Sequence, residues 1–344
     1  MKTKEIIVMD GMKELKVSMD AARFAQFESL AHRDSVKSIL GDASEGMGFL
    51  VSQLAYTEAK AFARQYTPMQ YERLVPLSSE AGEWAEVIRY QMYDQVGQGK
   101  RISGKDRAIP KVDVSDADKT MPVYLGGVGY DYSQEELRRA AHLKSPLPTR
   151  KLGAAIEAYR RHINTVALTG EAISGITGLF NNASVPHASA PTGSWGGGTT
   201  TEAQVLADLN TAIMKVWENS GYNDFPTHLV LPPSSFAYLV TTPRGTQSDS
   251  TLLKFILDNN MAKLQGGVNV VIEPGIGLET AGAGNTKRLV AYVKNEDRVV
   301  MHLPMPLRFL APQPVGLMID IVGEYKYSGV EVRYPNSMYY MDGL

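Results

Sequence analysis

The chain has 344 residues, of which 44% are hydrophobic and 21% are charged, and its formal net charge is −2. A chain of this size can bury one large core or two smaller ones. The hydrophobic fraction excludes a disordered chain. The near-neutral charge argues against a protein that coats nucleic acid, because such a protein needs a basic excess to displace counterions.

The sequence contains no cysteine. This excludes disulfides, thiolate metal sites and a cysteine nucleophile, and it is compatible with a reducing compartment. No basic and apolar leader begins the chain, and no run of about 18 apolar residues occurs in it. We therefore expect a soluble protein without a signal peptide or a membrane span.

Residues 1–48 are expected to form an arm with a short helix, because Phe24, Phe27 and Leu30 recur there at helical spacing. A second helix is predicted for residues 49–65, before Pro68.

A long β-hairpin is predicted from Glu83 onward. Two extended segments, EWAEVIRYQMYDQVG and VDVSDADKTMPVYLGGVGYDYS, flank a polar loop that contains glycine. Against a single Asp106, the loop carries five basic residues: Lys100, Arg101, Lys105, Arg107 and Lys111. Most basic loops are simply solvated; the alternative is a contact with an acidic surface on another chain.

Residues 151–169 show the clearest helical pattern. An apolar stripe runs along them, and Gly170 is a typical C-terminal stop. The stripe consists of Leu152, Ile156, Tyr159, Ile163 and Val166.

Residues 200–300 alternate helix and strand, as in a compact α/β lobe. Thr201 and Gln204 predict a capping box for a helix that ends near Gly221. The last forty residues are mostly extended, and Gly329 between two alternating runs predicts a final hairpin.

No motif for catalysis, nucleotide binding or metal binding is complete. In ALTGEAISGITGLFNN, Gly170 and Gly175 have the spacing of a phosphate-binding loop, but Ile176 stands where the lysine belongs, and a helix precedes the loop instead of a strand. TGSWGGG falls one residue short of a nucleophile elbow. The histidines lack metal-ligand spacing, and His162 on the long helix is the one most worth following.

Asp113, Asp116 and Asp118 lack the turn glycine and the closing glutamate of a calcium loop. We therefore assign no catalytic, cofactor-binding or metal-binding residue. We expect that the protein binds no cofactor and is not an enzyme.

The segment YRRHINTVALTGEAISGITGLFNN resembles the end of the spine helix in the major capsid proteins of tailed bacteriophages. These proteins have the Hong Kong 97-type fold, which they share with encapsulins. The matching residues are Leu168, Gly170, Gly175, Ile176, Gly178, Leu179 and Asn181. LVLPPSSFAYL also resembles the strand-to-helix entry of that family's axial domain.

The resemblance implies an α+β fold of the Hong Kong 97-like type. Its parts would be an N-arm (1–48), an extended E-loop hairpin (83–125), a peripheral domain (49–82 and 126–189) with spine helix 151–169, an α/β axial domain (190–298), and strands that return to the peripheral domain (299–344).

The implied function is a major capsid protein that self-assembles into hexamers and pentamers of an icosahedral head around double-stranded DNA, held without sequence specificity. It would be a virion component assembled in the cytoplasm of the host bacterium, with separate scaffolding, portal and decoration proteins as partners and no membrane. A two-stranded ribbon cannot bury both of its faces on its own subunit, so contacts between subunits are expected at Lys100, Arg101, Lys105, Arg107, Phe24 and Phe27.

Two family features lack a counterpart here. We expect no long scaffolding segment before the arm. Lys100 or Lys105 and Asn336 are the positional candidates for a lysine–asparagine cross-link, but no motif supports one. The alternatives are an encapsulin-type nanocompartment shell and, from a different class, a soluble α/β metabolic enzyme.

Overall fold

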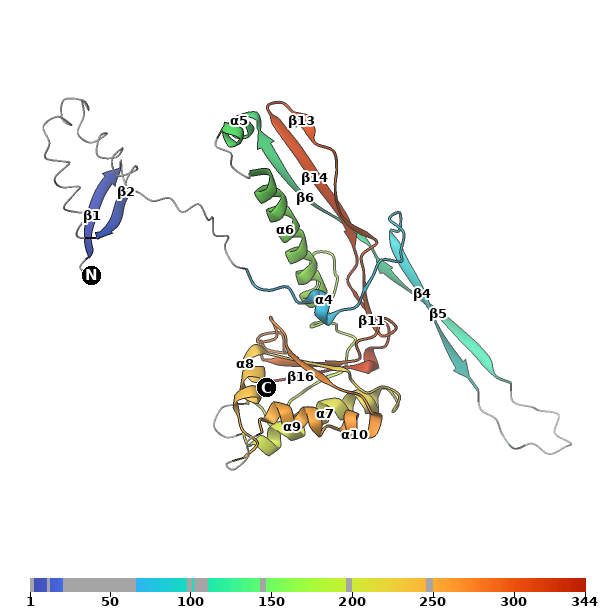
Figure 1. Ribbon diagram of the computed structural model, residues 1–344. Helices are drawn as coiled ribbons and strands as arrows, with labels where there is room; N and C mark the ends of the chain where they lie inside the picture. Colours follow the sequence, from blue (N-terminus) through green and yellow to red (C-terminus); the bar gives the residue numbers. More distant parts are fainter. Residues whose placement is uncertain are drawn as a thin grey trace, which may run out of the picture. The chain divides into compact units, whose positions relative to one another are not determined.

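The computed structural model describes most of the chain as two compact units, Met1–Thr67 and Pro68–Leu344 (Figure 1). The described residues are 3–10, 13–20, 66–97, 101, 111–142, 147–195, 200–245 and 250–344.

The first unit contains an antiparallel hairpin of β1 (Thr3–Asp10) and β2 (Lys13–Asp20). Asp10 pairs with Lys13, so the two strands are joined by a two-residue connection. This hairpin was not predicted, although Gly11, the first of the two connecting residues, is of the type that favours such turns. The predicted helices near Phe24 and at 49–65, and the predicted boundary at residue 48, lie outside the described residues.

The second unit contains helices of very different length and several small sheets. The helices are α4 (Tyr71–Leu74), α5 (Gln134–His142), α6 (Leu147–Thr169), α7 (Glu202–Asn219), α8 (Pro233–Thr241), α9 (Leu252–Asp258), α10 (Met261–Gly266) and the 3-10 helix η1 (Pro335–Ser337). The first seven strands are β3 (Leu77–Ser78), β4 (Val87–Val96), β5 (Asp113–Pro122), β6 (Tyr124–Ser133), β7 (His187–Ser189), β8 (His228–Leu231) and β9 (Val271–Pro274). The remaining strands are β10 (Arg288–Tyr292), β11 (Val299–His302), β12 (Met305–Phe309), β13 (Gln313–Val315), β14 (Met318–Tyr327), β15 (Val330–Val332) and β16 (Met338–Asp342).

A five-stranded sheet in the order β7-β16-β10-β8-β9 separates two hydrophobic cores. All five residues of β10 are buried, and its side chains alternate between the cores. Val290 and Tyr292 belong to one core, whereas Leu289 and Ala291 belong to the other. Because both faces of this strand are covered, neither core is complete without the sheet.

The α/β lobe lies on one face of this sheet, where α7 and α9 cover it (Figure 1). The predicted capping box is confirmed: the Gln204 side chain accepts a hydrogen bond from the Thr201 backbone N–H at 2.8 Å. The predicted helix is also confirmed, since its four apolar positions, Val205, Leu209, Ile213 and Val216, are all buried. Gly221 follows it with a φ of 69°.

On the other side, α6 packs beside an antiparallel sheet in which β14 pairs with β6, β12 and β13. The stripe predicted for α6 is buried only in its second half. Ile163 and Val166 are buried, whereas Ile156 is 36% exposed. The sequence pattern identified the apolar face of this helix correctly, but the subunit itself covers only part of that face.

The extended segment at 112–133 is divided in two at Val123, whose N–H donates to the Glu86 carbonyl at 2.9 Å. Before this point β5 pairs with β4, and after it β6 pairs with β14. One continuous run of extended residues thus serves two different sheets.

The hairpin predicted at Gly329 is wrong. The strands on either side do not pair with each other: β14 pairs with β6, β12 and β13, whereas β15 pairs with β11. Gly329 is needed for close approach, because a Cβ at this position would lie 2.0 Å from Ile176 Cγ2. The glycine marked a packing constraint and was misread as a turn.

The end of the chain also differs from expectation. Within 299–344, β11 to β15 lie in the smaller sheets, but β16 returns to the five-stranded sheet and pairs with β10 along its whole length. The last strand is therefore shared with the α/β lobe.

A buried ion pair holds β10, β16 and the segment after α6 together. Arg288 donates two hydrogen bonds to Asp342, at 2.6 and 2.8 Å, and a third to the Phe180 carbonyl at 2.8 Å. Burial raises the pKa of Asp342, but hydrogen bonds from Arg288 and Ala283 and the Arg288 charge lower it more, so the net pKa is below its ordinary value. Asp342 thus remains ionised and paired.

His228 in β8 is held in its neutral form. Its Nδ1 lies 2.9 Å from Thr227 Oγ1, and its ring centroid lies 5.6 Å from that of Tyr292. Burial lowers the pKa of His228 to about 4, and the charge of Lys294 acts in the same direction. Between this value and the ordinary value of about 6.5, the unfolded chain binds a proton that the folded chain does not.

We therefore expect the subunit to lose stability as the pH falls from about 6.5 to about 4. The variant His228→Phe cannot titrate at this position and keeps an aromatic ring against Tyr292. Over this pH range its free energy of unfolding should fall by about 1–2 kcal/mol less than that of the original chain. The measurement is urea unfolding of the subunit at pH 7.5 and 4.5. The exposed His142 gives the matched control, and His142→Phe should behave like the original chain.

Candidate functional site

The hairpin of β4 and β5 confirms the two predicted extended segments and is largely exposed. Ten residue pairs join the strands, from Val87 with Pro122 to Val96 with Asp113. One face pairs Gln91 with Asp118, and Arg89 forms an ion pair with Asp118 on that face. The other face is more apolar and includes Ile88, Tyr90, Met92 and Met121.

In the part of the chain that the structure describes, the contacts between the hairpin and the rest of the unit lie at its base. Arg308 donates hydrogen bonds to Glu83 and Glu324, each at 2.8 Å. Lys326 donates to the Ala85 carbonyl at 3.3 Å, and the Arg333 guanidinium lies 5.7 Å from the centroid of the Tyr90 ring. These contacts fix the base, and the strands then extend away from the body (Figure 1).

Large apolar side chains of the hairpin and its flanks face solvent, both at the base and further out. Trp84 is 86% exposed and Tyr93 is 71% exposed, and Val112 and Val114 are also exposed. Every residue of β5 except Met121 is exposed. A two-stranded ribbon with uncovered apolar residues is marginal in water, so this region has the properties of a surface that another chain covers.

The structure describes one of the predicted contact residues. Arg101 is exposed at the tip side of β4. Lys100, Lys105, Arg107, Phe24 and Phe27 lie outside the described residues. Asn336 lies exposed in η1. Sequence reasoning did not single out Trp84 as a contact residue, although its place just before an alternating, exposed strand was a usable signal.

The glycine-rich segment after α6 caps the C-terminus of that helix. Leu179 N donates to the Ala167 carbonyl at 2.8 Å, and Phe180 N donates to the Leu168 carbonyl at 2.9 Å. The Asn181 side chain donates to the Thr169 carbonyl at 2.6 Å. The last carbonyls of a helix have no partner within it, so this segment completes the hydrogen bonding of α6 and binds no phosphate through them.

The glycines of this segment have distinct roles. Gly170 has a φ of 74°, and a Cβ there would lie 2.2 Å from the Ile176 carbonyl oxygen. Gly175 has a φ of 68° but open space around it. Ile176, the residue that replaces the lysine of a phosphate-binding loop, is buried in the core, as is Leu179.

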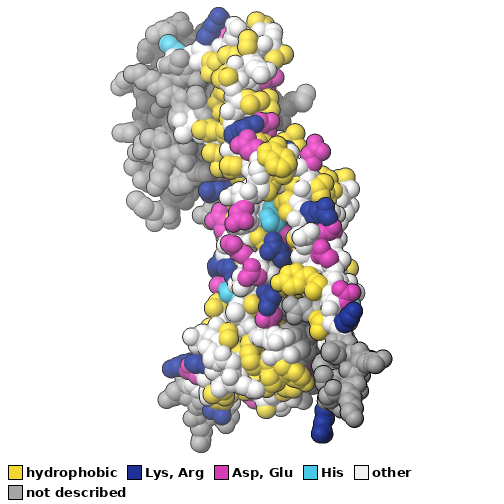
Figure 2. All heavy atoms as spheres, turned by 90° about the vertical axis from the view of Figure 1, so that its right-hand side faces the viewer, with side chains coloured by type: hydrophobic (Ala, Val, Ile, Leu, Met, Phe, Trp, Pro, Cys, Tyr) yellow, Lys and Arg dark blue, Asp and Glu magenta, His cyan; other side chains and the backbone are white. Residues whose placement is uncertain are grey.

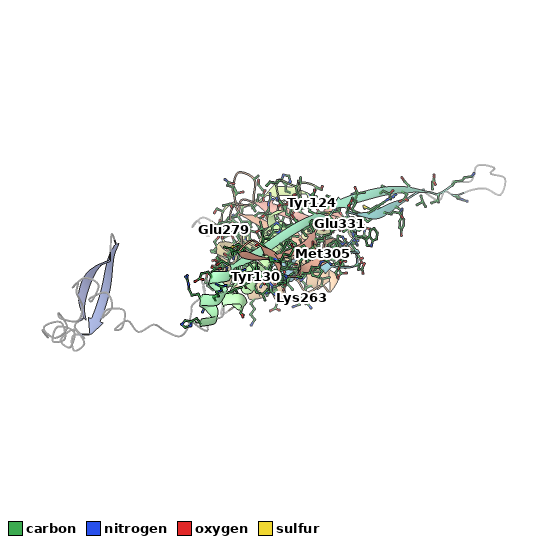
Figure 3. All side chains as sticks on the ribbon, turned by 90° about the horizontal axis from the view of Figure 1, so that it is seen from above. Tyr124, Tyr130, Lys263, Glu279, Met305 and Glu331 are labelled. Atoms are coloured by element: carbon green, nitrogen blue, oxygen red, sulfur yellow. The ribbon has the colours of Figure 1, made fainter. Side chains whose placement is uncertain are left out.

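His162 belongs to a hydrogen-bonded cluster between α6, β14 and this segment. The Tyr325 hydroxyl lies 2.8 Å from His162 Nδ1, and His162 Nε2 lies 3.8 Å from Glu171 Oε1. Tyr327 donates to Glu171 at 3.1 Å, and Ser174 also donates to it. Of these residues, His162, Tyr325 and Tyr327 border a cavity of about 300 Å³ next to β6. In Figure 3, Tyr124 lies at the hairpin end of β6 and Tyr130 lies further along the strand.

The pKa values in this cluster do not suit acid–base catalysis. The hydrogen bond from Ser174 lowers the pKa of Glu171; burial opposes this change, and Tyr327 adds to it. Burial, followed by the bond to Glu171, raises the pKa of Tyr327 far above its ordinary value. The pKa values of both groups therefore lie away from neutral pH, whereas a general acid or base works best when its pKa is near the working pH. The cluster ties the helix to the sheet.

Metal ligation is equally unsupported in the part of the chain that the structure describes, where no three histidine or acidic side chains converge. Asp116 and Asp118 lie on one face of β5, and Asp113 lies on the other. In the same residues, no helix combines the length and the apolar character needed to cross a membrane.

Comparison with known proteins gives one family match and several structural matches. A family model described as major capsid protein matches residues 97–344, which is more than half of the chain. The structure is similar to the capsid of Myoviridae phage XM1, with a TM-score of 0.74 and 17% identity, over 85% of this chain and 98% of the other. No curated protein sequence matches.

Two further solved structures share the fold. One is from Mycobacterium phage Bobi, with a TM-score of 0.56 and 12% identity, over 85% of this chain and 96% of the other. The second is from Gordonia phage Cozz, with a TM-score of 0.54 and 14% identity, over 86% of this chain and 93% of the other. The fold is thus the Hong Kong 97-type α+β fold expected from the sequence.

The two glycines after α6 provide a matched test of the cap. Gly175→Ala should lower the free energy of unfolding by about 1–2 kcal/mol, because alanine must adopt the left-handed backbone conformation there but meets no steric clash. Gly170→Ala should cost about 1–3 kcal/mol more, because its Cβ also collides with the Ile176 carbonyl. Urea unfolding of the unassembled subunit measures both. Equal losses would mean that the chain around Gly170 relaxes and that the cap is not rigid.

Proposed function

The chain belongs to the major capsid protein family, and on that premise we propose that it builds an icosahedral phage head of hexamers and pentamers around double-stranded DNA. Family membership makes the protein a capsid-forming virion component and a structural protein, not an enzyme. The proposal concerns the arrangement of the subunits, their contents and their partners.

The hairpin of β4 and β5 is the observation that carries the proposal. Among its described residues, the contacts with its own subunit lie at its base, and apolar residues such as Tyr93 and Val114 are exposed along its length. Lying across a neighbouring subunit would cover these residues. Repeated contacts of this heterologous kind generate closed shells when the rotation between subunits closes.

The other parts then take the roles that the resemblance implied. The α/β lobe would meet its copies around the five-fold and six-fold axes, and α6 would stiffen the peripheral part. The hairpin tip, with Lys100, Arg101, Lys105 and Arg107, and the arm, with Phe24 and Phe27, would make contacts between subunits. Separate scaffolding, portal and decoration proteins would complete the head in the cytoplasm of the host bacterium.

The charge of the chain suits a DNA content that the shell holds only weakly. A formal net charge of −2 leaves no general basic excess. An inner shell surface that bound the DNA phosphates tightly would hinder both packing and release of the genome. Binding without sequence specificity is therefore proposed, with no dedicated nucleic-acid site.

Deletion of residues 95–110 tests the role of the hairpin. The subunit should remain folded, because the contacts of the described hairpin residues with the body lie at its base and are kept. Shell assembly should be lost, since each subunit would lack its overlap with a neighbour. Sedimentation of the expressed protein, with circular dichroism of the unassembled subunit, measures both effects.

As a control, residues 98–110 are replaced by a glycine–serine linker of equal length, which keeps the connection and removes the side chains. Complete shells from the deletion variant would contradict the hairpin assignment. Negative-stain images of the original chain should show uniform polyhedral particles. Particles that never contain nucleic acid in infected cells would instead favour a nanocompartment of the same fold.

A further inference from the structure

The strand β6 lies at an edge of its sheet. It pairs with β14, which carries β12 and β13 on its other side. Gln134, directly after β6, donates its N–H to the carbonyl of Leu317, directly before β14. Because backbone groups alternate along an antiparallel strand, the N–H and C=O groups of Leu125, Gly127 and Gly129 point away from β14. No backbone hydrogen bond to these groups is found among the described residues.

This edge lacks the features that usually protect a sheet edge, which are proline, lysine and bulges. The opposite edge has them, since β12 contains Pro306 and an irregular register and β13 contains Pro314. Figure 2 looks at that side of the molecule, where charged side chains lie among hydrophobic ones. On β6, Lys151 reaches the Asp131 carbonyl at 2.6 Å, but the three residues with outward backbone groups are exposed and uncharged. The free edge of β6 therefore has the properties of a strand that pairs with another chain.

The helix α6 runs beside this edge (Figure 1). The cavity of about 300 Å³ is bordered by Gly126–Val128 of β6 and by Ala158, Tyr159 and His162 of α6. Ala158 is exposed, and so is Ala154, one turn earlier on the same side of the helix. The side of α6 that borders the free edge thus carries small side chains, which leave room for a second helix.

We propose that β6 pairs antiparallel with β6 of a second copy of this chain across a two-fold axis at Gly127, so that one continuous sheet joins two subunits. Gly127 then faces its own counterpart. Leu125 faces Gly129 of the second copy, where the missing side chain leaves space for the leucine. This pairing rests on the proposed function, in which neighbouring hexamers and pentamers meet across two-fold axes, and it adds the strand through which they join.

Charge complementarity favours a second copy as the partner. Glu157 and Arg161 lie one turn apart on α6, with 4.0 Å between their charged groups, and they flank Ala158 at the level of the axis. A two-fold axis places α6 of the second copy antiparallel to the first. Glu157 of each copy then faces Arg161 of the other, so the surface is complementary to itself, as an isologous contact requires.

The spacing of the elements also suits this pairing. The Tyr159 ring of α6 lies 4.7 Å from the Tyr325 ring of β14, between ring centroids, so α6 lies over both β6 and β14. Adjacent strands are about 4.8 Å apart. The two copies of α6 would then lie about 10 Å apart on one face of the joined sheet, which is the usual distance between packed helices.

The first experiment introduces one cysteine into a chain that has none. A Cβ on Gly127 has its nearest atom at 3.7 Å, so Gly127→Cys should fold and assemble. Oxidised after assembly, it should give dimers and no larger species on a non-reducing gel, because each copy meets one other copy at the axis. Ile173→Cys is the control. Ile173 is 98% exposed in the turn after α6, away from the axis, and this variant should remain monomeric on the gel.

The second experiment removes a single backbone donor. Gly127→Pro deletes an N–H that β14 does not use, so the unassembled subunit should keep its circular dichroism spectrum. Assembly should need at least about tenfold more protein, because two hydrogen bonds are lost in every pair of subunits. Gly127→Ala keeps the N–H and has room for its methyl group, so it should assemble at the concentration of the original chain.

Shells of Gly127→Cys that give no dimer after oxidation would overturn the inference. Assembly of Gly127→Pro at the original protein concentration would overturn it as well. Both results leave the proposed function intact, because shells are still formed. The proposed function itself fails if the original chain forms no polyhedral particles, and dimers of oxidised Gly127→Cys in solution would then still support the pairing of β6.

Discussion

The three hydrogen bonds of the Arg288 guanidinium join the parts on which the rest of the fold depends. Two of them go to Asp342 in the last strand, and one goes to the carbonyl of Phe180, just after the long helix. Removing one partner of such a buried pair leaves a charge without compensation, which typically costs 3–5 kcal/mol. The pair therefore fixes where the chain leaves α6, and this in turn sets the position of the segment that caps the helix and packs against Gly329.

The same chemistry explains why the glycine-rich segment resembles a phosphate site without being one. Its backbone N–H groups point at the carbonyls of Ala167 and Leu168, so the donors that would cradle an anion are already used. Ile176 fills the core at the position where a lysine would reach for a phosphate. The subunit leaves other surfaces uncovered, and the hairpin of β4 and β5 is one of them.

Much of this architecture could be predicted from the sequence, because several signals were local. The 3.6-residue period of α6 and α7, the capping box at Thr201, the glycine stop at Gly170 and the paired strands of the hairpin all depend on residues close together in the chain. The failures were non-local. Gly329 faces Ile176, far away in the sequence, and the pairing of β16 with β10 has no sequence signature. The pairing of β14 with β6 could not be seen either, because its register joins residues near 130 with residues near 320.

The alternation of β10 between two cores has a mechanical consequence. Leu289 and Ala291 point into one core and Val290 and Tyr292 into the other, so the strand acts as a shared wall with no flexible linker across it. Strain applied to one side of the subunit passes through that wall without a hinge to absorb it. In a shell made of such plates, each plate would resist internal pressure through its own stiffness.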